Sequence, residues 1–140
     1  MSQKTDIRND SDIRLLIDTF YAEVERDERL GYIFNEVASV DWKHHLPRMV
    51  DFWSHILFQT GRFSGRPFRK HLPLPIVPSD FELWLGLFFR TVDDLFEGER
   101  ADHAKETAAK IASAFLINMR GAGKFDNLPE QESAGPVKRE

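Results

Sequence analysis

The 140-residue chain has no cysteine and no long hydrophobic run. Without cysteine it cannot form disulfides, use a thiolate nucleophile, or hold zinc or iron–sulfur clusters through sulfur, so a metal ion would need nitrogen or oxygen ligands. No stretch approaches the ~20 consecutive apolar residues that cross a bilayer, and the polar start MSQKTDIRNDSD lacks the apolar segment of a secretory signal. We therefore expect a cytoplasmic protein that does not act at a membrane.

The chain has no excess of basic charge, whereas aromatic side chains are abundant. The net charge of −4 argues against nucleic acid as the partner, because phosphate binding requires a basic face. A chain with 41% hydrophobic residues can bury one core but is too short for two. Its 12 phenylalanines and 3 tryptophans indicate that the single domain builds or encloses something large and apolar.

Apolar residues recur at intervals of three and four along four segments, which is typical of amphipathic helices. The first helix is expected to begin at a cap on Asp10 or Ser11 and to run to about Leu30, where Gly31 provides a stop. Residues 32–37 follow as a turn or a single helical turn.

The second and third helices are also marked by caps. Asp41 is expected to cap the second helix, and Pro47 either bends that helix or marks where regular winding begins. Ser79 and Glu82 form a capping-box pattern at the start of the third helix, which Gly98 ends. These boundaries leave an irregular segment between the two helices.

The remaining segments complete an all-α domain. A last helix is expected over residues 101–120, and no segment has a convincing strand pattern. Residues 1–10 are interpreted as a polar leader, residues 11–123 as the folded domain, and residues 124–140 as a disordered tail with few apolar side chains.

The irregular segment contains GRPFRKHLPLP, in which prolines surround His71. Pro67 can open a short helix that Pro73 and Pro75 end, so the backbone would hold the histidine firmly. One imidazole nitrogen could then donate to a nearby carbonyl while the other presents a lone pair, which is how a metal ligand is oriented. The alternative is an ordinary surface or capping histidine.

Three polar side chains lie on apolar helix faces. His45 shares a face with Met49, four residues on, which favours His45 over His44 as the inward histidine. Tyr21 and Trp84 lie on the apolar faces of the first and third helices, where a buried hydroxyl or indole N–H needs a hydrogen-bond partner. Taken singly, each of these side chains is more often ordinary core than part of a site.

Together these segments resemble the group III truncated haemoglobins, in order and with matching spacing from about residue 11 to residue 120. The chain also lacks the glycine pairs that mark the other truncated groups. The resemblance implies a shortened globin fold, a two-over-two helical sandwich that encloses haem b. The stretches that carry it are FYAEV, LGYIF, WKHHLPRMVDFWSHIL, GRFSGRPFRKHLPLP and FELWLGLFFRTVDDLF.

The resemblance also implies roles for individual residues. His71 matches the proximal histidine that binds haem iron, and Phe34 matches a phenylalanine that packs on the porphyrin. Tyr21, His45 and Trp84 match the distal tyrosine, histidine and tryptophan, and they are our candidate catalytic residues.

Further residues are candidates for contact with the haem. Met49 and Trp53 would face it from the second helix. Arg66, Arg69 and Lys70 could pair with its propionates, or could form a solvated basic patch.

Several functions follow from this resemblance. The expected ligands are O₂, nitric oxide or other small haem ligands, and a pocket rich in donors favours redox chemistry over transport. Oxidation of nitric oxide or a peroxidase-like reaction would need an external reductase or electron donor. Two alternatives remain: a six-coordinate electron-transfer or sensor protein in which His45 binds the iron, and a cofactor-free helical interaction module.

Overall fold

The computed structural model describes residues 4–63 and 77–121, which form helices and no strand. The all-α class expected from the sequence is confirmed. The expected short helix at Pro67 and the expected disordered tail lie outside the described residues. The elements are α1 (Asp10–Arg26), α2 (Glu28–Gly31), the π-helix η1 (Tyr32–Val37), α3 (Trp42–Phe58), α5 (Pro78–Leu95) and α6 (Glu99–Gly121).

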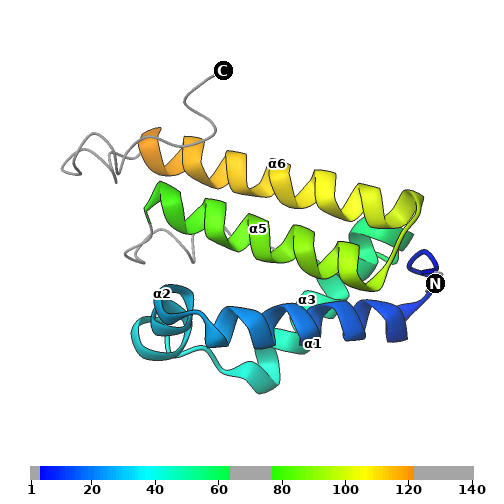
Figure 1. Cartoon of the computed structure of the whole chain (residues 1–140), viewed down its shortest axis with the longest axis horizontal. Helices are drawn as coiled ribbons and strands as arrows, with labels where there is room; N and C mark the ends of the chain where they lie inside the picture. The colour runs from blue at the N-terminus through cyan, green and yellow to red at the C-terminus, as the bar shows by residue number, and fades with distance from the viewer. Residues whose placement is uncertain (1–3, 64–76, 122–140) are drawn as a thin grey trace.

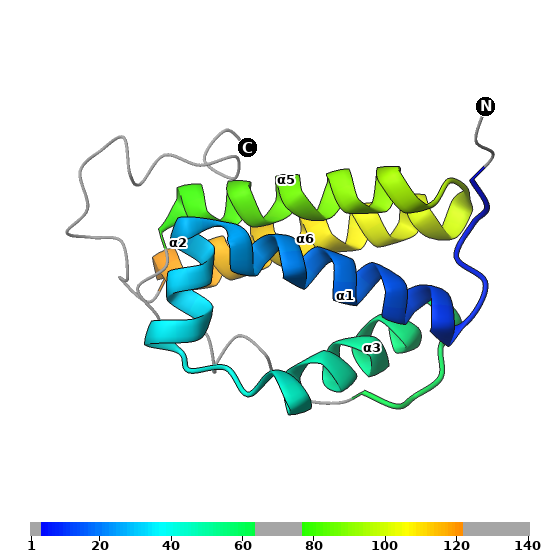
Figure 2. The ribbon, with the colours of Figure 1, turned by 60° about the horizontal axis from the view of Figure 1, so that its bottom comes forward.

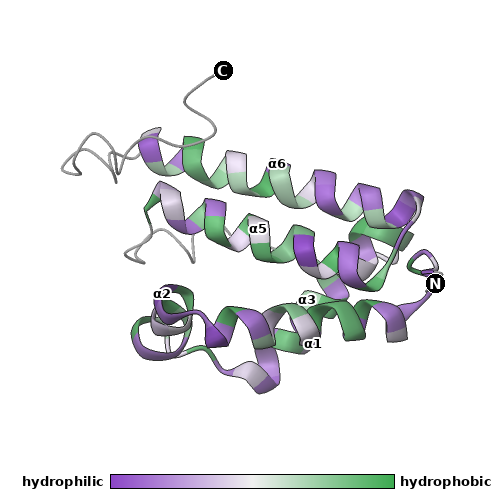
Figure 3. Cartoon of the chain, in the orientation of Figure 1, coloured by the Kyte–Doolittle hydropathy of each residue, from purple (hydrophilic) through white to green (hydrophobic). Residues whose placement is uncertain are grey.

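The four long helices form two packed pairs, α1 with α3 and α5 with α6. Figures 1 and 2 show α5 and α6 side by side, with α1 alongside α5 and α3 next to α1. Along each long helix, hydrophobic and hydrophilic residues alternate around the axis, as Figure 3 shows, so that one face is available for packing. This arrangement confirms the two-over-two sandwich. No helix in the described part of the chain is long and apolar enough to span a membrane.

Aromatic rings join the two pairs at the centre of the core. Phe88 of α5 is fully buried, and its ring stacks on Trp53 of α3 with centroids 5.0 Å apart. The ring of Phe20 from α1 meets Phe88 edge-on at 5.1 Å. Burying a side chain of this size contributes about 1.5–3 kcal/mol, so these contacts fix the spacing of the helices around the site.

Helix α1 begins and ends earlier than expected. Its cap is Asn9 rather than Asp10 or Ser11, because the Asn9 side chain accepts the backbone N–H of Asp12 at 3.0 Å. The helix ends at Arg26, one turn before the expected end at Leu30.

α-Helical winding does end at Gly31, as expected, and the chain continues from there as the short π-helix η1. The earlier break occurs at Asp27, whose carboxylate caps α2 by accepting the N–H groups of Arg29 and Leu30. Gly31 is needed for space, because a Cβ atom there would lie 2.5 Å from the carbonyl oxygen of Glu25. The glycine therefore permits a tight approach between α1 and α2.

The expected cap of α3 at Asp41 is confirmed by its side chain, which accepts the N–H of Lys43. The helix is already wound from Trp42, so the alternative that winding begins at Pro47 is wrong.

Helix α5 begins with Pro78 in its first turn, not with a cap at Ser79. Proline suits this position because its missing N–H would have no helical partner there. The Asp80 carboxylate accepts the N–H of Val77 at 3.0 Å, which takes the place of the expected Ser79 and Glu82 pairing. The helix ends at Leu95, ahead of Gly98.

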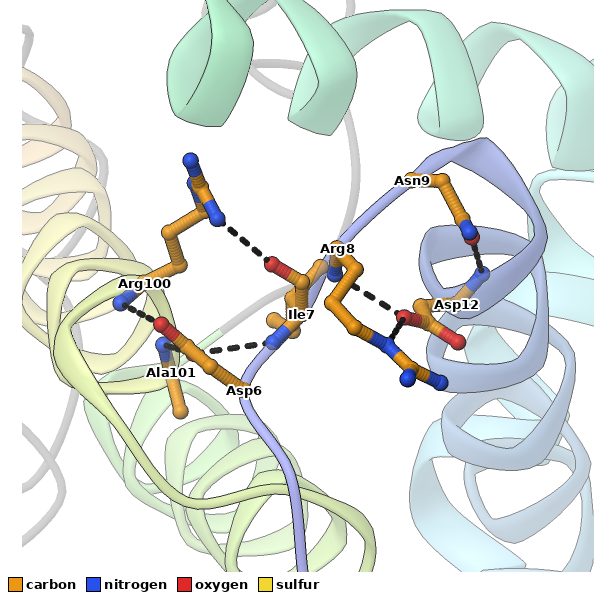
Figure 4. A network of polar contacts seen from close by, with 7 residues as sticks. All are labelled: Asp6, Ile7, Arg8, Asn9, Asp12, Arg100 and Ala101. Carbon is orange, nitrogen blue, oxygen red and sulfur yellow. Dashed lines mark hydrogen bonds and ion pairs between the residues drawn. The ribbon is translucent and has the colours of Figure 1, made fainter.

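The first residues of the described chain pack against the start of α6 (Figure 4). Ile7 is fully buried in the main core. The Asp6 carboxylate accepts the N–H groups of Arg100 and Ala101, each at 2.9 Å, and therefore caps a helix that begins more than ninety residues later. Gly98 allows this approach, because a Cβ atom there would lie 2.5 Å from the Asp6 side chain.

Candidate functional site

A cavity of about 240 Å³ lies among α1, η1, α3, α5 and α6. Its lining is mainly aromatic and aliphatic, with a few polar groups. Six residues singled out by the sequence line this cavity: Tyr21, Phe34, His45, Met49, Trp53 and Trp84. The structure therefore brings together candidates that lie on α1, η1, α3 and α5.

Tyr21 and Trp84 form a hydrogen-bonded pair at the cavity. Tyr21 is 6% exposed, and the indole N–H of Trp84 donates to its hydroxyl oxygen. Burial raises the pKa of the Tyr21 phenol well above its ordinary value of 10.0, and the bond from Trp84 offsets only part of this rise. The hydroxyl therefore stays protonated at neutral pH. Since its oxygen accepts from Trp84, its own proton is the one that Tyr21 can donate to a ligand.

His45 is the inward histidine of the pair at the start of α3. Its ring lines the cavity, lies 5.0 Å from the Tyr21 ring between centroids, and has an Nε2 atom shielded from solvent. The side chain of His44 is 85% exposed, and its Nδ1 lies 2.6 Å from a carboxylate oxygen of Asp41. Consecutive residues on a helix point about 100° apart, so only one of the two can face the cavity.

Several lining residues were not predicted as site residues. They include Phe52, Phe63, Phe81, Ile111 and Phe115, which come from α3, α5, α6 and the chain after α3. In the sequence four of these residues have the helical spacing of ordinary core side chains, whereas Phe63 lies in the irregular segment after α3. That signal predicts that a residue is buried, but it cannot say whether the residue faces a neighbouring helix or a cavity.

One charged group at the cavity was also missed. Asp80 lines it, is 5% exposed along its side chain, and is held by Arg29 through Nε and Nη2, each 3.0 Å from a carboxylate oxygen. This two-pronged contact joins α2 to the first turn of α5. An acidic residue in the first turn after Pro78 is a visible feature of the sequence, but its partner 51 residues away is not.

The expected iron ligand His71 and the basic candidates Arg66, Arg69 and Lys70 lie outside the described residues. Phe63 and Asp80 are the cavity-lining residues nearest to these four in the sequence.

Comparison with known proteins gives consistent results. The sequence model of the family described as "Bacterial-like globin" matches residues 6–117. The group 3 truncated hemoglobin of Campylobacter jejuni is 35% identical over 111 residues, which cover 76% of this chain and 87% of that protein. The crystal structure of group III truncated hemoglobin from Campylobacter jejuni superposes with a TM-score of 0.71 and covers 81% of this chain and 92% of that one.

Proposed function

The chain belongs to the bacterial-like globin family and, within it, to the group III truncated haemoglobins, and we propose that it performs redox chemistry on small ligands at haem b. Haem binding and the binding of small gases such as O₂ follow from the family. The observation that carries the finer proposal is the meeting of Tyr21, His45 and Trp84 at one mainly apolar cavity. The lack of cysteine suits a reducing cytoplasm, where we propose that the chain acts.

The described residues fit a haem group. Flat rings and aliphatic side chains from several helices offer the apolar contacts that a planar macrocycle needs, with Phe34, Met49 and Trp53 among them. When bound, haem supplies an iron centre that takes up diatomic gases and changes its oxidation state. We propose His71 as its proximal ligand, and Arg66, Arg69 and Lys70 as partners of its propionates.

The protein's own contribution is to hold and polarise the ligand. Tyr21 donates a hydrogen bond to the ligand through its hydroxyl group. Trp84 keeps the phenol oriented through its N–H, and the apolar lining excludes water. A hydrogen bond to an acceptor that carries negative charge is worth about 1.5–3 kcal/mol. Such a bond slows release of the ligand, which suits chemistry on a held ligand better than transport.

Two reactions fit this arrangement. The first is oxidation of nitric oxide by O₂, and the second is a peroxidase-like reaction in which Tyr21 and Trp84 assist O–O cleavage. Either reaction needs electrons from an external reductase or another donor.

His45 favours a second candidate function. Its imidazole lines the same cavity, with Nε2 shielded from solvent. If His45 bound the iron opposite His71, the protein would have a six-coordinate haem suited to electron transfer or sensing. A low-spin spectrum that His45→Leu abolishes would support this candidate, and a five-coordinate ferrous spectrum would contradict it. Because haem binding follows from the family, we do not propose the cofactor-free interaction module.

The experiment that tests the proposal is an ultraviolet–visible titration with haem, in the ferric and ferrous states. We expect the protein to give a Soret band that His71→Ala shifts or abolishes, because that imidazole is the proposed axial ligand. The matched control is His103→Ala, which removes an exposed histidine from α6 and should leave the band unchanged. A folded protein with no specific Soret band would overturn the proposal.

A further inference from the structure

Four aromatic rings at the cavity, or next to it, contact one another in every combination. They belong to Tyr21, Phe34, Trp42 and His45, and their centroids lie 5.0–6.2 Å apart in all six pairs. These separations fall within the range of favourable aromatic contact. Three of the rings line the cavity, whereas Trp42 does not. Trp42 therefore packs against the other three rings without lining the cavity itself.

Trp42 is itself held in place by η1. Its indole N–H donates to Oδ1 of Asn35 at 2.8 Å, and its ring stacks on Phe34 with an angle of 12° between the planes. Trp42 is the first residue of α3, so this contact closes the connection between η1 and α3. A half-buried indole that is stacked and also hydrogen-bonded has little freedom to change rotamer.

From this arrangement we infer that Trp42, fixed by Asn35, is a positioning residue that sets where the Tyr21 and His45 rings stand in the cavity. The inference rests on the proposed haem function. The indole lies 5.5 Å from each of the two rings, and His45 follows it by three residues on the same face of α3. If Trp42 moves, both rings gain space on the side away from the cavity.

The hydrogen bond makes the inference testable without disturbing the core. Asn35 is exposed, so it can be replaced with little effect on folding. Asn35→Leu removes the acceptor at similar volume, whereas Asn35→Asp keeps an oxygen that the indole N–H can reach. Trp42→Phe removes the donor but keeps a ring, and Trp42→Ala removes the backing altogether.

The readouts are the C–O stretching band of the haem protein under carbon monoxide, which senses nearby donors, and the O₂ dissociation rate. For Trp42→Ala we expect the band to broaden or split and the rate to rise by about twofold to tenfold, which corresponds to the loss of one or two aromatic contacts. Trp42→Phe and Asn35→Leu should give smaller changes of the same kind. Asn35→Asp should match the unaltered protein.

The control for general loosening is Ile7→Ala. Ile7 is fully buried beside the start of α6 and does not line the cavity, so the variant lowers stability at the other end of the fold from the four rings. If Ile7→Ala shifts the band as far as Trp42→Ala does, or if Trp42→Ala leaves band and rate unchanged, the inference is wrong. Failure of the unaltered protein to show a Soret band would instead overturn the haem proposal.

Discussion

At the scale of single residues, the phenol of Tyr21 carries our proposal for how a ligand is held. Its oxygen accepts from Trp84, and burial raises its pKa, so it is a neutral donor at any physiological pH. Trp84 has only one N–H, and in this structure that N–H serves the tyrosine. In this arrangement Trp84 supports the phenol, and Tyr21 is the member of the pair that we propose as the donor to a ligand.

We predict that Tyr21→Phe raises the O₂ dissociation rate by roughly tenfold to a hundredfold, which corresponds to one hydrogen bond to a charged acceptor. Stopped-flow replacement of O₂ by carbon monoxide measures the rate. Tyr32→Phe is the matched control, because this second tyrosine is 53% exposed and does not line the cavity. An unchanged rate in Tyr21→Phe would remove the basis for redox chemistry on a held ligand.

The sequence was sufficient to place the inward histidine but not its surroundings. Helical spacing from Met49 selects His45, and the structure places both side chains at the cavity. The same periodicity cannot show that Trp42 packs behind His45, because the partner Asn35 lies on a separate element whose π-helical winding has no clear sequence signal.

At the scale of elements, the contact between α2 and α5 holds two parts of the cavity wall together. α2 runs directly into η1, which carries Phe34, and the first turns of α5 carry Trp84. The Arg29–Asp80 pair is a polar link between α2 and α5. The side chain of Asp80 is 5% exposed and that of Arg29 is 43% exposed. Because the carboxylate is buried, removing its partner leaves a poorly solvated charge.

We predict that Arg29→Ala lowers the free energy of unfolding by about 2–4 kcal/mol, somewhat less than for a fully buried pair. The control is Arg26→Ala, which breaks an exposed pair with Glu23 and should cost about 0–1 kcal/mol. Chemical denaturation of both variants measures the difference. Equal losses would show that the Arg29–Asp80 pair is an ordinary surface contact.

Helix starts were predicted to within one or two residues, and only the cap of α3 was predicted at the residue that forms it. Asp41 can cap α3 through a local hydrogen bond, and the structure confirms it. A glycine such as Gly31 is typical of a helix end. In the structure Gly31 also allows α2 to pack closely against the backbone of Glu25 in α1, and this contact cannot be read from the local sequence. Propensity alone cannot distinguish these two uses of glycine.

At the scale of the whole molecule, contacts between distant parts of the chain close the two-over-two sandwich. The resemblance predicted the layers, but nothing in the sequence paired the first residues with the start of α6. Thr5 accepts the N–H of Glu97 through its carbonyl, Asp6 caps α6, and Arg100 donates to the carbonyl of Ile7. Figure 4 shows the bonds of Asp6 and Ile7 that tie the N-terminal segment to the start of α6.

The charge on Asp6 makes this closure sensitive to acid. Burial raises the pKa of Asp6, but bonds from the N–H groups of Arg100, Ala101 and Ile7 outweigh it and bring the pKa below its ordinary value of 3.8. A carboxyl group with a lowered pKa in the folded state stabilises the protein above pH 3.8, and this contribution is lost as the pH falls through the folded-state value.

We predict that Asp6→Asn lowers the free energy of unfolding by about 1–2 kcal/mol at neutral pH, because an amide cannot accept through both of its polar atoms. As the pH falls below about 4, Asp6 of the unaltered protein becomes protonated and no longer carries a charge. The free energies of unfolding of the unaltered protein and of Asp6→Asn should therefore converge. Urea denaturation at neutral pH and at steps down to pH 3 measures this convergence. Asp102→Asn, at a side chain 73% exposed on the same helix, is the control and should track the unaltered protein at every pH. The difference in the free energy of unfolding between Asp6→Asn and the unaltered protein could instead stay constant as the pH falls. That result would mean that the Asp6 side chain acts through its shape and not through its charge.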